Sequence, residues 1–263
     1  MHRPIIVVFL FAIGIGPAFG AVPGGDPDSS FAHTFVLFLH QLLLVYWLGP
    51  DIAVYIWSRR VVSPELGPEQ RIAASRLMTR IDIVPRACLA LFLTVAGILS
   101  DTYGIEHPWW QLAGIVLLGP VWLFLVLAAW LKRGSDFGRT MARLDIWLRA
   151  LLVVAIPASV VFASVTGRLA DTPWITGKLM MLAAIILLGL LMRRRLSGYR
   201  EGMELLATDG PSPQLDHRIA ASVKSARPYV YAIWALLLWA ALLGLIKPGE
   251  PEAPLPAAGI AAR

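Results

Sequence analysis

The stretch TPWITGKLMMLAAIILLGLLMRRR, residues 172–195, decides the fold. Residues 174–192 form an apolar run with a single charge, and a helix needs about 20 such residues to cross a membrane. The three arginines that follow are typical of the cytoplasmic end of a span, because basic residues collect on that side. The stretch therefore predicts a membrane-spanning helix that enters from the outside and ends in the cytoplasm.

Five further apolar segments have the length of a span: 31–57, 82–100, 109–131, 146–166 and 228–246. The composition of the whole chain also indicates a membrane protein, since its 263 residues have a mean hydropathy of +0.68 and only 15% of them are charged. Average soluble domains carry roughly 25% charged residues. We therefore expect an all-α, polytopic transmembrane helical bundle of six spans, with the lipid bilayer as its main partner.

The connections between the spans predict the orientation of the bundle. Arginines and lysines crowd the first, third and fifth connections, whereas SDTYGIEHP (100–108) and GRLADTP (167–173) on the other side hold few. The net charge of +6 thus reflects topology, and nucleic acid is not an expected partner. We expect a multi-pass protein of the bacterial inner membrane with both termini on the periplasmic side, and a single long loop at 196–228.

The chain begins with MHRPIIVVFLFAIGIGPAFGA, a basic start followed by an apolar run and small residues. This pattern predicts a secretory signal peptide over residues 1–21, with an uncleaved anchor as the alternative. The six-helix domain then covers 22–246, and the Pro- and Ala-rich end, 247–263, is expected to be a disordered outer tail.

One helical hairpin is duplicated in the sequence. RLMTRIDIVPRACL (76–89) and RTMARLDIWLRALL (139–152) share eight of fourteen residues, which predicts a repeat of 76–131 in 139–194. Both copies start in the cytoplasm, so the repeats are parallel. Many transporters are instead built from inverted repeats, so the duplication does not favour an alternating-access carrier.

Each copy carries an aspartate and an arginine four residues apart, Asp82 with Arg86 and Asp145 with Arg149. This spacing places each pair on one helical face. The pairs either anchor two helices at the cytoplasmic interface or form a charged vestibule to which Asp51 contributes. Because Asp51 follows Gly49-Pro50 inside a span, we expect an arginine of these pairs to be its partner.

His40, in FLHQLLLVYWLGPD (38–51), lies roughly 13 Å below the start of the first span at 1.5 Å per residue. Its imidazole has three interpretations: a hydrogen bond to a neighbouring helix, an axial ligand of haem iron, or copper binding or proton relay. Lys178 lies in the same leaflet. It either extends to the outer interface or shares a site with His40.

Two motifs resemble a known family. The first is Leu39-His40 followed by Trp47-Leu48-Gly49 and an arginine-rich loop, and the second is the helix that begins GKLMML at residue 177. Together they resemble the bacterial membrane proteins of the copper-resistance D and HemJ group. HemJ-type members are haem b-binding, oxygen-independent protoporphyrinogen oxidases, so the resemblance implies haem b, with His40 as a functional histidine and Lys178 as a functional lysine. The six spans and the signal segment differ from the shorter HemJ pattern.

The leading hypothesis is therefore an inner-membrane haem b protein with a redox or electron-transfer role, which includes a protoporphyrinogen-oxidase-like reaction. In it His40 binds the iron, Lys178 is the catalytic or propionate-binding residue, and His107 is the candidate second ligand. A homo-oligomer and a membrane electron-transfer partner are compatible with this role. The alternatives are a permease component for copper or another small solute and a scaffold or assembly subunit without chemistry.

Overall fold

A computed structural model describes residues 31–63, 65–105 and 107–249 of the chain. The expected signal peptide, 1–21, and most of the expected outer tail, 247–263, lie outside these residues. The described residues fold into helices and contain no strand.

Six helical segments are long and apolar enough to cross a membrane. Their helices are α2 (Phe31–Val61), α4 (Ile83–Thr102), α5 (Trp109–Leu131), α6 (Asp136–Val165), α7 (Pro173–Arg195) and α9 (Pro213–Ile246). Two shorter helices, α3 (Pro68–Ile81) and α8 (Ser197–Thr208), continue α4 and α7 beyond the apolar layer. The predicted all-α polytopic bundle is confirmed.

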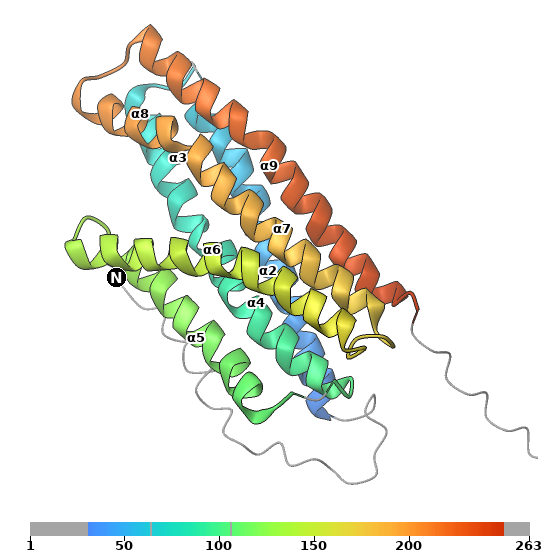
Figure 1. Cartoon of the computed structure of the whole chain (residues 1–263). Helices are drawn as coiled ribbons and strands as arrows, with labels where there is room; N and C mark the ends of the chain where they lie inside the picture. The colour runs from blue at the N-terminus through green and yellow to red at the C-terminus, as the bar shows by residue number, and fades with distance from the viewer. Residues whose placement is uncertain (1–30, 64, 106, 250–263) are drawn as a thin grey trace, which may run out of the picture.

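Helices that follow one another along the chain pack side by side, and α9 returns to contact α2. Figure 1 shows α6 crossing the other helices obliquely, with α3 and α8 together at one end of the molecule. All six spans contribute to one apolar core, for example through Trp47, Leu89, Trp122, Ile156, Ile186 and Leu237. The core is therefore the interior of a closed ring of helices.

We name the two ends of the bundle by the connections they carry. The basic end holds the connections 62–67, 132–135 and 209–212 together with α3 and α8, and the opposite end holds 103–108 and 166–172. A second apolar cluster, which includes Val61, Tyr199 and Ile219, fills the basic end. The connection expected as a long loop at 196–228 is instead α8 and the first four turns of α9, so only residues 209–212 separate two helices.

The two repeats differ at one point of the backbone. In the second repeat α6 runs without interruption through Asp145, whereas in the first the helix breaks between α3 and α4 at Asp82. Pro85 stands three residues later, where the second repeat has Leu148. A proline removes the hydrogen bond to the carbonyl four residues earlier, here that of Ile81, and thereby interrupts the helix. In α2, by contrast, Pro50 is accommodated within one helix of 31 residues.

Candidate functional site

The buried face of α2 places His40 inside the bundle. Three of the buried residues of this helix, His33, His40 and Trp47, stand seven residues apart. Seven residues are close to two helical turns, so the three side chains point in nearly the same direction. His40 is only 6% exposed, and it therefore faces protein and not lipid.

His40 packs against α4 through an aromatic contact. Its ring centroid lies 4.5 Å from that of Phe92, and the Phe92 ring also meets the Trp47 ring edge-on, with 5.7 Å between centroids. The Nδ1 atom of His40 is buried and has no hydrogen-bond partner. Leaving a buried polar atom unsatisfied costs about 1–3 kcal/mol. The hydrogen bond to a neighbouring helix that the sequence suggested for this imidazole is therefore not made by Nδ1.

Its neighbour His33, by contrast, is hydrogen-bonded. Its Nδ1 lies 2.8 Å from Oγ1 of Thr102, and its ring meets Tyr103 edge-on at 5.0 Å between centroids. The hydroxyl of Thr102 also donates to the carbonyl of Leu99 at 2.7 Å. His33 thus joins α2 to the end of α4, while His40 is buried on the same face without such a bond.

Lys178 belongs to a cluster of aromatic and cationic side chains at the opposite end. Its Nζ lies 5.4 Å from the ring centroid of Trp174, one turn earlier on α7. Nζ of Lys247, which follows α9, lies 4.6 Å from the ring of Tyr103 and 5.9 Å from that of Trp174. The indole nitrogen of Trp174 is buried without a hydrogen-bond partner. Two ammonium groups therefore lie near one indole ring, whose own N–H is buried without a hydrogen-bond partner.

A glycine of α9 makes room for the Lys178 ammonium. A Cβ atom at Gly244 would lie 2.7 Å from Nζ of Lys178, much closer than two unbonded heavy atoms of this kind approach. The position of Nζ therefore depends on the absence of a side chain at residue 244.

Lys178 and His40 lie on helices that are far apart in the sequence, yet the lysine charge acts on the imidazole. The charges of Lys178 and Lys247 act on each other as well. Both residues lie in the half of the bundle that leads to the opposite end, His40 on α2 and Lys178 on α7.

His107 occupies a different place, between α4 and α5. Its Nδ1 accepts a hydrogen bond from Nη2 of Arg168 at 3.0 Å, so its proton is on Nε2, which donates to Oγ of Ser100 at 2.9 Å. Partial burial and the charge of Arg168 lower the pKa of His107 below its usual value. Both ring nitrogens are used in these bonds, and no described contact joins His107 to His40.

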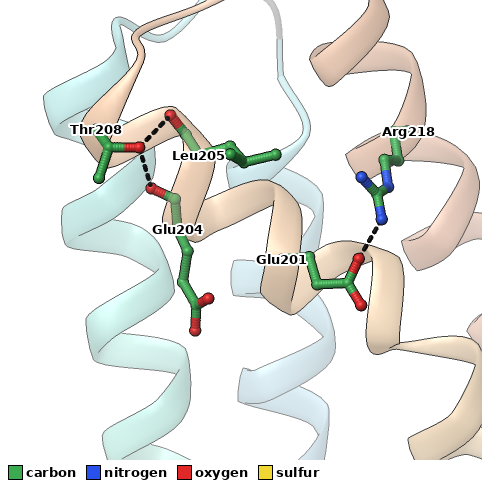
Figure 2. Close-up of a pocket in the computed structure, with 5 residues that line it drawn as sticks. All are labelled: Glu201, Glu204, Leu205, Thr208 and Arg218. Atoms are coloured by element: carbon green, nitrogen blue, oxygen red, sulfur yellow. Dashed lines mark hydrogen bonds and ion pairs between the residues drawn. The ribbon is translucent and has the colours of Figure 1, made fainter.

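A cavity of about 700 Å³ opens beside His107 at the opposite end of the bundle. Arg168 lines it and also donates from Nη1 to Oε1 of Gln111 at 2.9 Å. A smaller cavity of about 330 Å³ lies between α8 and α9 at the basic end. Figure 2 shows that Glu201 and Arg218 pair with each other across it, and that Thr208 bonds to the backbone of its own helix. Neither cavity is lined by His40 or Lys178.

The ion pair of the second repeat is buried near the basic end. Asp145 accepts hydrogen bonds from Nε1 of Trp122 at 2.9 Å, Nε of Arg149 at 2.9 Å and Nη2 of Arg193 at 3.3 Å. The guanidinium of Arg149 also lies 5.3 Å from the ring centroid of Trp122. One carboxylate therefore connects α5, α6 and α7.

The ion pair of the first repeat is more exposed. Asp82 and Arg86 form the predicted pair, with side chains that are 25% and 41% exposed. Asp51 accepts a hydrogen bond from Nε1 of Trp234 at 2.7 Å, while the charges of Arg86 and Asp82 act on it from farther away. The expected arginine partner of Asp51 is thus replaced by a tryptophan of α9 as the hydrogen-bonding group.

Sequence reasoning missed several polar residues of the interior. From the sequence, Arg193 was only one of the three arginines that end the span at 174–192, and no role was predicted for Trp122, Trp174 or Trp234. Arg71 is buried at the basic end, where it donates to the carbonyl of Val61 at 2.7 Å and to Asp216 at 2.5 Å. These partners lie far apart in the sequence, so no local pattern could have identified them.

Within the described residues no group of three or more His, Cys, Asp and Glu side chains is arranged to hold a metal ion. Comparison of the chain with models of protein families, with curated proteins and with solved structures finds no match. The support for the candidate site is therefore its geometry alone. The site consists of a buried histidine, whose Nδ1 has no hydrogen-bond partner, and a group of cations in the same half of the bundle.

Proposed function

We propose that this membrane protein binds haem b through His40 and has a redox or electron-transfer role. The observation that supports this proposal is the buried Nδ1 of His40, which has no hydrogen-bond partner. Haem-binding proteins hold the iron through side chains such as histidine, and their surroundings exclude water. The Phe92 and Trp47 rings supply an apolar environment of that kind beside His40.

The cations at the opposite end have the charge needed to bind the propionate groups of a haem. Haem b carries two propionate carboxylates, and Lys178 and Lys247 supply two ammonium groups near one indole ring. The unpaired N–H of Trp174 is a further donor for a carboxylate oxygen. In this proposal His40 would hold the iron and the two lysines would orient the macrocycle, while Gly244 keeps the Lys178 ammonium in place.

The bound group would supply one-electron chemistry, and the protein would supply ligation, orientation and a dry environment. His107 is engaged by Arg168 and Ser100, so we propose His40 as the single histidine ligand from this chain. The arginine-rich basic end would face the cytoplasm of a bacterium and the opposite end the periplasm, because basic loops are retained on the cytoplasmic side.

The experiment is a titration of the purified protein with haem in mild detergent, followed by absorption spectroscopy, in the wild type and in Lys178→Met and Lys247→Met. We expect one haem per chain in the wild type and weaker binding in both lysine variants. Lys132→Met is the matched control, because that lysine lies at the basic end. Equal binding in all four proteins, or binding without a defined stoichiometry, would contradict the proposed site.

A further inference from the structure

Four arginines gather where the spans end at the basic end, and we call them the arginine cluster: Arg86, Arg133, Arg149 and Arg193. They come from α4, the α5–α6 connection, α6 and α7. Arg86 lies in the first turn of α4 and Arg193 in the last turn of α7. The cluster therefore lies near the boundary of the apolar layer and not at its centre.

The cluster has more cations than the neighbouring carboxylates can balance. Its charges act on one another and on those of three aspartates, Asp51, Asp82 and Asp145. Four arginines thus face three carboxylates, and the cation is in excess even when every aspartate is ionised. Burial and the charge of Arg86 lower the pKa of Arg133, which indicates that an additional cation is unfavourable there.

Arg149 supplies a donor that no residue described by the structure satisfies. Its side chain is only 7% exposed, and its Nη2 atom is buried without a hydrogen-bond partner. Its Nε is used by Asp145, and its guanidinium plane rests near Trp122. Because a buried charged group is costly unless its donors are bonded, an acceptor from outside the chain would be stabilising at this point.

Two members of the cluster connect Arg149 to the surface. The Arg193 side chain is 25% exposed and the Arg86 side chain 41% exposed, and the charges of both act on Arg149. Arg193 and Arg86 are therefore the members of the cluster that are partly open to the surroundings. Guanidinium groups have a planar fork of donors that matches the oxygens of phosphate and carboxylate groups.

We propose that Arg86, Arg149 and Arg193 form a binding site for an oxyanion of the phosphate class at the basic boundary of the spans. The phosphate belongs either to the headgroup of an anionic lipid or to a small soluble phosphate. This site is separate from His40 and Lys178, and it does not depend on haem.

The test uses the full chain, purified in a neutral detergent and depleted of lipid, with thermal unfolding followed by tryptophan fluorescence. Sodium phosphate is compared with sodium chloride at equal ionic strength, and phosphatidylglycerol with phosphatidylcholine in mixed micelles. A ligand that binds only the folded state raises the midpoint of unfolding. Stabilisation by phosphatidylglycerol alone identifies a headgroup site, and stabilisation by phosphate as well identifies a site that also accepts the free anion.

Two variants assign the effect to the cluster. Arg193→Gln removes a partly exposed member, and Arg149→Lys keeps the charge but loses the forked donors. Each should weaken the apparent affinity about tenfold or more, since one hydrogen bond to a charged group has at least that effect. Arg139→Gln is the matched control, because Arg139 is an exposed arginine at the start of α6, paired with Asp136.

The proposal is overturned if neither phosphate nor phosphatidylglycerol raises the midpoint beyond its control. It is also overturned if Arg193→Gln and Arg149→Lys respond like the wild type and Arg139→Gln. Since Arg193→Gln keeps the Asp145–Arg149 pair, it provides a folded variant if Arg149→Lys is too unstable to measure.

Discussion

Nε of Arg149 donates to Oδ1 of Asp145 over 2.9 Å, and both side chains are almost fully buried, at 7% and 5% exposed. The corresponding pair of the first repeat, Asp82 and Arg86, lies at the same spacing but is far more exposed. The duplication has therefore preserved the residues while the packing around them has diverged. The difference is due to Trp122 and Arg193, which close over the second pair.

This divergence predicts unequal effects of equal substitutions. Asp145→Asn should lower the free energy of unfolding by about 3–5 kcal/mol, because it leaves a buried arginine without its counter-charge. Asp82→Asn should cost less than about 1 kcal/mol, as is usual for exposed pairs. The measurement is denaturant-induced unfolding of both variants in the same detergent. Similar losses for the two variants would contradict the burial described for Asp145.

Two glycines of α5, the buried Gly119 and the exposed Gly114, predict opposite results for the same substitution. A Cβ at Gly119 would lie 2.7 Å from Oγ1 of Thr94, which accepts the Gly119 N–H at 2.8 Å and donates to Ile115. Gly119→Ala should therefore cost about 1–3 kcal/mol by overpacking α4 against α5. Gly114→Ala, on the same helix with open space around its Cβ, is the control and should be neutral or stabilising. Thermal unfolding of the two variants gives the comparison.

Gly244→Ala should behave differently, because its close neighbour is the flexible end of Lys178 and not backbone. The lysine can move its ammonium at little cost, and alanine favours the helix by up to about 1 kcal/mol over glycine. We therefore expect unchanged or slightly higher thermal stability together with weaker haem binding. Loss of stability without any change in haem binding would show that Lys178 has no part in the site.

His107 predicts a pH dependence of stability. In the folded protein His107 is neutral, since its Nδ1 accepts a hydrogen bond from Arg168. Burial and the charge of Arg168 lower the pKa of His107. The contribution is therefore fully present above the unfolded pKa of about 6.5 and is lost as the pH falls through the lower folded value. The thermal midpoint of the wild type should be measured from about pH 8 to about pH 4, a range that includes the usual pKa of histidine. It should fall toward the acidic end of this range. His107→Asn should show a smaller fall, and an identical profile would contradict the neutral, hydrogen-bonded state.

Much of the fold could be predicted from the sequence, because spans of apolar residues and arginine-rich connections follow from the membrane itself. The pairs Asp82–Arg86 and Asp145–Arg149 were also predicted, since spacing by four residues is a local rule. The segment 196–228 was expected as a loop because it contains turn-forming residues such as Gly210 and Pro211, but α8 and the start of α9 occupy most of it.

The partners of the interior residues were not predictable in the same way. Asp51 meets Trp234 across 183 positions, and Asp145 meets Arg193 across 48. Such contacts depend on which helices pack against each other in the bundle, and the hydropathy of the sequence does not predict this. The depth of His40 could be predicted from its position in the span, but the direction of its side chain could not. That direction follows from the buried face that His33, His40 and Trp47 share on α2, which packs against α4.

The most direct test of the proposed function is the absorption spectrum of His40→Ala beside that of His33→Ala. Both variants are purified from cells with ample haem supply, together with the wild type. The two histidines lie on the same face of α2, but only His40 has a buried nitrogen without a partner. We predict a Soret band in the wild type and in His33→Ala, and its loss in His40→Ala. A colourless wild type, or a His40→Ala protein with the same haem content, would contradict the proposal.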